Sequence, residues 1–377
     1  MTSKRCARPL RKARFVAWGL VVAFSLSSWA RADSFIYRNL VVDDSSVGAS
    51  QIIDPSLKNA WGISFGPATP FWVSANGAGL STLYTVNPAT DATTKNGLEV
   101  SIPGDGSVTG QAFNIGTGFN ADRFLFVSED GTISGWRGAL GTTAERLQVA
   151  DPANIYKGMT LADVGGHTYL YAANFGTGAI DVLKGDTNAP TLAGRFSDPT
   201  LPAGYAPFNI QLLNGKLYVS FAVKGGKDEV AGPGLGIVSV FDTNGNFLNR
   251  LATGGTLDAP WGLAVAPSSF GKFAGDLLVG NFGDGTISAF NLTSGQFAGQ
   301  LAGLDGNPLV IDGLWALTVG NNGSGGSSDK LYFSAGPNDE ANGAFGLITL
   351  VPEPGSVVLG LIALGLLGGI QRLRARS

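Results

Sequence analysis

The middle of the chain repeats one pattern of short apolar segments. Each copy opens with an aromatic or apolar residue beside a small one, as in Trp61-Gly62, and continues with two further apolar segments separated by turns. The copies begin near positions 61, 114, 157, 209, 261 and 315, so they are 43 to 54 residues apart. A unit of this size cannot bury both of its faces alone, so the copies must stack on one another.

A period of this length, built from short strands and glycine-rich turns, predicts a β-propeller. The 56 glycines fit a fold with frequent tight turns, because glycine reaches positive φ without steric cost. Six copies predict an all-β, six-bladed ring over residues 33–350. An additional apolar segment, residues 36–42, precedes the first copy. We expect it to close the ring as the outer strand of the last blade, which would cover an exposed sheet edge.

The first 32 residues have the pattern of a secretory signal peptide. Six basic residues and no acid lie in residues 1–14, and residues 15–29 are largely apolar. The small residues Ala30 and Ala32 then predict cleavage by signal peptidase after Ala32. A retained membrane helix is the alternative. The only cysteine, Cys6, lies in the segment that cleavage removes, so the exported chain has no thiol chemistry.

The last 27 residues form a second signal in three parts. Pro352, Glu353 and Pro354 come first, the uncharged residues 356–370 follow, and three arginines end the chain. The prolines delay any helix until after Pro354. Fifteen helical residues span roughly 22 Å, short of the ~30 Å hydrocarbon core, so flanking residues or local thinning would complete a crossing. The arginines would remain on the cytoplasmic side. An ordinary C-terminal anchor is the alternative.

This tail resembles the PEP-CTERM sorting domain of Gram-negative bacteria, and the resemblance covers residues 351–377. It implies that exosortase recognises Pro352, Glu353 and Pro354 while the helix anchors the protein transiently in the inner membrane. The protein then reaches the outer surface or the extracellular space. The repeats resemble six-bladed propellers of the NHL and gluconolactonase kind. They resemble more closely an uncharacterised bacterial propeller family that often carries this tail, through residues 54–55, 59–63 and 70–74. That family implies no settled activity.

The charge of the exported chain argues against one class of partner. Without the ten basic residues of the two terminal signals, 15 basic residues remain against 28 acidic ones, a net charge of −13. Nucleic-acid phosphates require a basic surface, so we expect no nucleic-acid partner.

Few residues could carry catalysis. His167 is the only histidine, which excludes a histidine-rich metal site, and it reads as a surface turn residue. A Ser-His-Asp triad would need His167, and the chain has no G-x-S-x-G motif to support one. Phosphate-binding and dinucleotide-binding glycine motifs are also absent. We therefore predict no catalytic residue and no certain cofactor.

Amide and carboxylate side chains remain as candidate ligands. The turns between strands and the starts of the inner strands would place several of them on one face of the ring, as a candidate ligand or cation site: Asn76, Asn114, Glu129, Asn174, Asn209 and Asn281. Such oxygens suit Ca²⁺. The alternative is that these residues only form turns, which asparagine favours for backbone reasons. The aromatic residues that open the copies are likewise either packing between blades or a platform for a sugar ring. They are Trp61, Phe113, Phe208, Trp261 and Trp315.

These observations favour an exported, non-catalytic binding module for matrix exopolysaccharide or for surface proteins. One alternative is a Ca²⁺-dependent lactonase or other hydrolase with its site on the propeller axis. Another is a structural spacer. The two terminal sorting signals and the lack of a recognisable set of catalytic residues support the binding module. The polar residues in the turns support the hydrolase.

Overall fold

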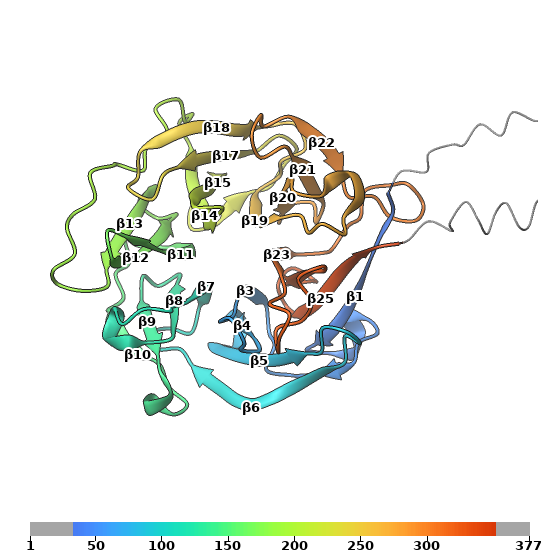
Figure 1. The fold of residues 1–377 in the computed structure, drawn as a ribbon, viewed down its shortest axis with the longest axis horizontal. Coiled ribbons are helices and arrows are strands. Elements are labelled where there is room, and N and C mark those ends of the chain that lie inside the picture. The colour runs from blue at the N-terminus through green and yellow to red at the C-terminus, as the bar shows by residue number, and fades with distance from the viewer. Residues whose placement is uncertain (1–32, 352–377) are drawn as a thin grey trace, which may run out of the picture. The chain divides into compact units, whose positions relative to one another are not determined.

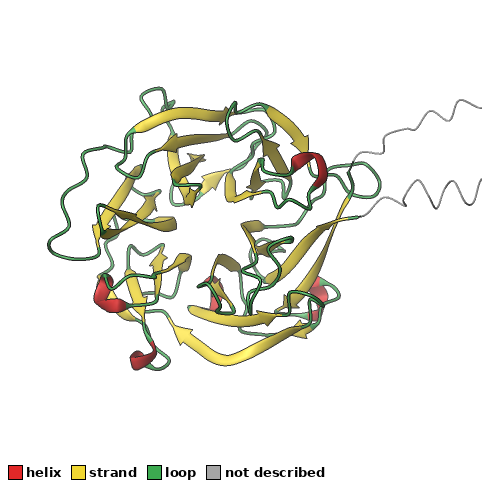
Figure 2. Cartoon of the chain, viewed as in Figure 1, coloured by secondary structure: helices red, strands yellow, loops and turns green. Residues whose placement is uncertain are grey.

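The computed structural model describes residues 33–351, which form six sheets arranged as a ring (Figure 1). The predicted signal peptide with Ala30 and Ala32, and the sorting segment with residues 352–354, lie outside this range. Helical structure within the described range consists of short 3-10 turns (Figure 2): η1 (Ser45–Val47), η2 (Asn76–Ala78), η3 (Phe119–Ala121), η4 (Gly138–Leu140) and η5 (Gly271–Phe273). None of the helices between residues 33 and 351 has the length and hydropathy of a membrane span.

Each sheet is one blade, and in the first five blades the strands follow one another in chain order outward from the axis. The first blade contains β3 (Ala60–Ser64), β4 (Phe71–Ala75), β5 (Leu80–Val86) and β6 (Thr93–Ser101). The second contains β7 (Val108–Phe113), β8 (Phe124–Ser128), β9 (Ile133–Trp136) and β10 (Glu145–Gln148). The third contains β11 (Tyr156–Val164), β12 (His167–Asn174) and β13 (Ala179–Lys184).

The other three blades are built in the same way with two exceptions. In the fourth the short β16 pairs only with β15, and in the sixth the two outer strands come from the start of the chain. The fourth contains β14 (Tyr205–Leu213), β15 (Lys216–Lys224), the short β16 (Glu229–Val230), β17 (Gly236–Phe241) and β18 (Phe247–Thr253). The fifth contains β19 (Pro260–Val265), β20 (Leu277–Asn281), β21 (Ile287–Phe290) and β22 (Phe297–Gln300). The sixth contains β23 (Leu314–Val319), β24 (Leu331–Ala335), β25 (Ala344–Leu350), β1 (Phe35–Val42) and β2 (Ile52–Ile53).

The small residue in the repeat lets neighbouring inner strands approach closely. A Cβ atom on Gly62 would lie 2.5 Å from the carbonyl oxygen of Thr109 in the next blade. A Cβ on Gly262 would lie 2.7 Å from the carbonyl oxygen of Trp315. These separations are shorter than van der Waals contact, so a side chain here would push the blades apart.

The second blade begins earlier than the sequence suggested. We expected a start near 114, but β7 begins at Val108, and Asn114 follows the end of the strand. Gly110 takes the place that Gly62 has in the first blade, since its Cβ would lie 2.6 Å from the backbone nitrogen of Met159. The start was missed because the true opening, Val108 to Gln111, contains no aromatic residue.

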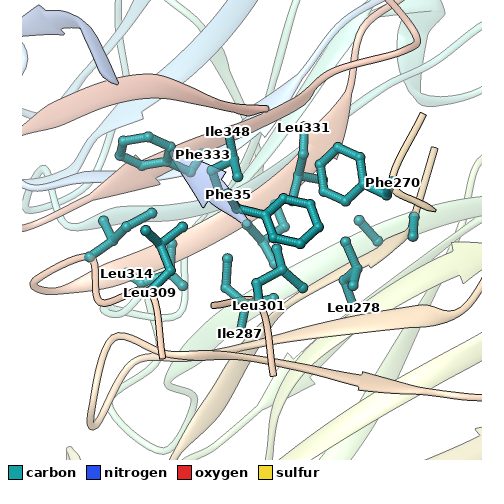
Figure 3. Close-up of a cluster of buried hydrophobic side chains, with 14 of the residues drawn as sticks. Phe35, Phe270, Leu278, Ile287, Leu301, Leu309, Leu314, Leu331, Phe333 and Ile348 are labelled. Atoms are coloured by element: carbon teal, nitrogen blue, oxygen red, sulfur yellow. The ribbon is translucent and has the colours of Figure 1, made fainter. Parts of the chain in front are cut away.

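The N-terminal strand completes the sixth blade. β1 pairs antiparallel with β25 from Phe35 opposite Leu350 to Val42 opposite Ala344, with a bulge between Asn39 and Val41. Its first side chain also joins this blade to the fifth, because the Phe35 ring lies 5.0 Å from that of Phe270 within a buried apolar cluster (Figure 3). Burying a side chain of this size is worth about 1.5–3 kcal/mol. The first described strand therefore ties both ends of the ring together.

The third blade differs from the others because irregular chain follows its third strand. Residues 185–204 form the long green loop between β13 and β14 in Figure 2. Ala189 and Phe196 from this loop are buried against Tyr171 and Phe241, so the loop covers the cluster between the third and fourth blades. Side-chain packing here replaces the hydrogen bonds of a fourth strand.

The axis has two distinct ends, which we call the strand-start face and the strand-end face after the ends of the six inner strands. Aromatic side chains fill the axis at the strand-start face. The rings of Trp61 and Trp315 stack at 3.7 Å, and Phe282 stacks on the other side of Trp315 at 4.0 Å. Together with Phe208 and Trp261 they form the aromatic plug.

The plug decides between the two interpretations of the recurrent aromatic residues. Trp61, Trp261 and Trp315 are each at most 2% exposed and contact one another across blades, so packing between blades is confirmed for them. A sugar ring could not reach buried faces of this kind. Phe113 was grouped with them wrongly, because it lies at the end of β7.

Candidate functional site

A buried lysine lies beside the aromatic plug at the strand-start face. Lys157, the second residue of β11, has a side chain that is 2% exposed. Its Nζ atom lies 2.5 Å from Oε1 of Glu129 and 3.1 Å from Oδ1 of Asp228. The same atom lies 5.4 Å from the ring centre of Trp61 and 5.9 Å from that of Phe175, in the range of cation–π attraction. Lys157 is thus held by charge and by aromatic faces together.

Four carboxylates surround this one cation. Glu229 and Glu340 interact electrostatically with Lys157, in addition to the two carboxylates bonded to it. Burial alone lowers the pKa of Lys157, but the surrounding negative charges outweigh burial and raise the pKa above its ordinary value. The group therefore carries one positive charge against an excess of acid, and Lys157 stays protonated at neutral pH.

Burial acts on the acids in the opposite direction. It raises the pKa of Glu229, and the nearby charge of Lys157 offsets this in part. Burial also raises the pKa of Glu340, whose carboxylate accepts a 2.5 Å hydrogen bond from Asn59 Nδ2. Both shifts come from removing a charged group from water.

Asn59 links the plug to the acidic group. Its Oδ1 accepts a 3.1 Å hydrogen bond from Nε1 of Trp315, while its Nδ2 donates to Glu340 and, at 3.3 Å, to Oδ1 of Asn76. Asn76 in turn donates to Oε2 of Glu129 at 3.3 Å. A continuous set of hydrogen bonds therefore runs from the buried plug to the carboxylate that holds Lys157.

A pocket of about 500 Å³ opens next to this network, between the loops of the second, third and fourth blades. We call it the acidic pocket. Its polar lining is Asp105, Ser107, Glu129, Asp130, Lys227 and Asp228. Apolar area comes from Pro152 and Ile155. Four carboxylates against one lining lysine give the pocket a negative field.

Only two of the six predicted ligand residues come together. Asn76 and Glu129 are bonded, as described above, and Glu129 also lines the acidic pocket. Asn114 lies after β7, at the other end of that inner strand from this group. Its Nδ2 donates to the carbonyl oxygens of Gly118 and Asp122, so it stabilises its own loop.

The other three asparagines are buried and hydrogen-bonded within the fold. Asn174 accepts from the backbone nitrogens of Ile155 and Thr177 and donates to Asn154 and Asp181. Asn281 bonds to the backbone of Asp258 and Thr256 and to the hydroxyl of Thr286. Asn209 donates to the carbonyl oxygen of Trp261 at 2.8 Å. In each case the hydrogen bonds are those expected of turn-forming or strand-bridging amides.

His167 lies at the start of β12, and its Nδ1 is 2.8 Å from Oδ2 of Asp186. This pair is separate from the Lys157 group. Among residues 33–351, no three or more His, Cys, Asp or Glu side chains are grouped so as to hold a metal ion.

The central residue of the site, Lys157, was not among the predicted site residues. The sequence did contain a signal, because Lys157 precedes Gly158 at the position where Trp61 precedes Gly62. A lysine at a repeat position otherwise occupied by a buried aromatic residue requires a counter-charge. Asp228, Glu229 and Glu340 supply the counter-charge from segments that are distant in sequence and that only folding brings together.

Known proteins resemble the chain over most of its length. Uncharacterized protein R648 of Acanthamoeba polyphaga mimivirus is 29% identical over 320 residues, covering 78% of this chain and 76% of the viral protein. Uncharacterized protein L690 of the same virus is 29% identical over 334 residues, covering 82% and 84%. A crystal structure of glucose dehydrogenase matches 84% of this chain and all of that chain, with 13% identity and a TM-score of 0.50, which shows a shared fold alone.

The C-terminus gives the most specific match. Residues 350–375 match the PEP-CTERM protein-sorting motif. This motif implies export and processing by exosortase. The chain is therefore a six-bladed β-propeller that carries a PEP-CTERM sorting signal at its C-terminus.

Proposed function

We propose that this protein is an exported, non-catalytic binding module that takes a neutral or basic saccharide of the extracellular matrix in its acidic pocket. The domain division that goes with this proposal is a signal peptide at 1–32, the propeller at 33–350 and the sorting signal at 351–377. The sorting motif supplies the destination, and the acidic pocket supplies the surface on which a ligand would bind.

The lining of the acidic pocket carries the proposal. Carboxylates accept hydrogen bonds from sugar hydroxyls, Ser107 can donate or accept, and Pro152 and Ile155 offer apolar area to the ring. The excess of carboxylates would repel a polysaccharide that carries acidic groups. It would attract one that carries amino groups.

The Lys157 network supports this role by holding one wall of the pocket in place. Glu129 lines the pocket while bonded to both Lys157 and Asn76, and Lys157 is itself buried beside the rings of Trp61 and Phe175. A site whose groups are fixed before binding loses less side-chain entropy when the ligand arrives.

Calorimetric titration of the exported protein tests the proposal. We expect chitosan oligosaccharides to bind most tightly, neutral dextran oligosaccharides to bind more weakly and oligogalacturonates not to bind. The double variant Asp105→Asn/Asp228→Asn should weaken chitosan binding about tenfold, as expected for the loss of interactions between charges. Asp305→Asn removes a carboxylate outside the pocket and is the matched control.

Two results would overturn the proposal. One is tightest binding of the acidic oligosaccharide, and the other is equal chitosan binding by the double variant and the parent. Calcium titration followed by assays of lactone hydrolysis with and without chelator tests the hydrolase alternative. Calcium binding together with hydrolysis that the chelator abolishes would favour a hydrolase over a binding module. Absence of binding to all three saccharides and to surface-protein extracts would favour the structural spacer.

A further inference from the structure

A second cavity lies on the axis, at the end away from the acidic pocket. An inner space of about 30 Å³ is lined by residues from all six inner strands. A wider space of about 270 Å³ adjoins it and is lined mainly by residues from the later halves of those strands. Five residues line both spaces: Ile63, Gln111, Met159, Gln211 and Thr318. The two spaces therefore form one axial channel that opens at the strand-end face.

The aromatic plug closes the channel at its inner end. Trp261 lines the inner space and also contacts Trp315 edge to face, with ring centres 5.9 Å apart. Trp315 is fully buried between Trp61 and Phe282. A molecule entering from the strand-end face would stop at Trp261 and could not reach the Lys157 group.

Within the described range, residues 33–351, no charged side chain lines either space of the channel. The lining groups are amides, hydroxyls and apolar side chains, with Phe65 and Phe113 at the wider part. An ion brought into such a channel would lose water without gaining a counter-charge, which is strongly unfavourable. The lining therefore selects an uncharged ligand.

Two polar side chains of the channel have hydrogen-bonding capacity left over. The half-buried amide of Gln211 has no hydrogen-bond partner among residues 33–351, and the buried Oγ of Ser64 has none in the same range. Gln111 differs, because its amide bonds to the carbonyl oxygens of Gly62 and Trp72 and to Ser81. Gln211 is only half-buried, so its amide is free to bond to a guest in the channel, whereas the Oγ of Ser64 is enclosed by the protein.

We propose that the axial channel binds a small, uncharged, hydroxyl-rich molecule about the size of one sugar ring. Gln211 supplies a donor and an acceptor to its hydroxyl groups, and Phe65 and Phe113 offer apolar area to its C–H face. This site is independent of the acidic pocket, from which the aromatic plug separates it.

Three sugars of matched shape test the proposal by calorimetric titration of the exported protein. D-Glucose is uncharged, D-glucosamine is a cation and D-glucuronate is an anion at neutral pH. We expect binding of D-glucose and at least tenfold weaker binding of D-glucuronate. D-Glucosamine could also enter the acidic pocket, so it is measured in the Asp105→Asn/Asp228→Asn background, where its binding should be weak.

Substitutions at Gln211 locate the binding in the channel. Gln211→Leu should weaken D-glucose binding about tenfold, as expected for lost hydrogen bonds, and Gln211→Glu should reverse the preference in favour of D-glucosamine. Gln296→Leu changes an exposed glutamine that lies between β21 and β22 and does not line the channel. This control should leave D-glucose binding unchanged. Thr318→Val provides a second channel variant if a Gln211 variant fails to fold.

Absence of D-glucose binding at millimolar concentration would overturn the proposal, as would equal binding of D-glucuronate. Unchanged D-glucose affinity in folded Gln211→Leu would overturn it as well. The acidic-pocket double variant should still bind D-glucose as the parent does, so failure at one site is distinguishable from failure at the other.

Discussion

The two ends of the propeller axis are built from the same six strands and have opposite chemistry. The strand-start face has large aromatic rings, one buried lysine and a group of carboxylates. The strand-end face has an open channel lined by amides, hydroxyls and apolar groups. The comparison shows that ring geometry alone does not determine what an axis can bind.

The difference follows from side-chain size along each inner strand. At the strand-start face, Trp61 and Trp315 fill the axis and leave no channel, so polar groups are displaced outward into the loops. At the strand-end face, the corresponding side chains include Thr318 and Gln211, which are smaller than tryptophan, so space remains between them. The plug also keeps the charges of one end away from the neutral lining of the other.

The largest expected effect is at Lys157. Lys157→Met should lower the free energy of unfolding by about 3–5 kcal/mol, because it leaves Glu129 and its neighbouring carboxylates without their cation. Urea unfolding at neutral pH measures this. The control Lys227→Met alters an exposed lysine and should change stability by no more than about 0.5 kcal/mol. A loss below about 1 kcal/mol in Lys157→Met would show that the charge group does not depend on its lysine.

A smaller, pH-dependent effect is expected at Glu340. Burial raises the pKa of this carboxyl above its ordinary value of 4.5, so its ionised form destabilises the folded state. Glu340→Gln should therefore match the parent in stability below pH 4.5 and become increasingly more stable than the parent as the pH rises toward neutral. The difference in free energy of unfolding between the two proteins should be modest, because Glu340 is only half-buried and water screens its charge.

Thermal or urea unfolding of both proteins across this pH range provides the measurement. Gln211→Leu at the uncharged strand-end face serves as the comparison. Its difference from the parent in free energy of unfolding should not vary with pH. A stability difference between Glu340→Gln and the parent that becomes smaller as the pH rises would contradict a raised pKa for Glu340.

The smallest effect is expected at the strand-end face. Gln211→Leu should change the free energy of unfolding by no more than about 0.5 kcal/mol, because the amide of Gln211 has no hydrogen-bond partner among residues 33–351. Urea unfolding measures this change in free energy, with Lys157→Met measured in parallel. A loss above about 1 kcal/mol would mean that Gln211 stabilises the fold and is not free to bind a guest.

Sequence reasoning was most successful where a pattern recurred. The six-bladed fold was predictable because an aromatic residue followed by a small one marks several of the inner strands. The aromatic rings pack between blades, and the small residue lets neighbouring inner strands approach closely. The register of the second blade was missed because Val108 to Gln111 has no aromatic residue. Periodicity identifies a blade only where the repeated residue is present.

The candidate site was less predictable. Asn174 and Asn281 have the same residue type and turn position as Asn76, yet both bond only within their own blade and the loop that leads into it. Asn76 instead bonds to Glu129 of the next blade. A local pattern cannot separate these cases, because the deciding partner is distant in sequence. Lys157 was recognisable only as a charge at an aromatic position.

The sequence by itself determined the blade number, the all-β class and the sorting signal, since each depends on residues that are adjacent or regularly spaced. Tertiary structure alone decided that Glu129, Asp228 and Glu340 share one lysine, and that the axis is closed at one face and open at the other. The physical reason is that charge pairing and cavity shape depend on distances between blades. Those distances exist only after the ring has closed.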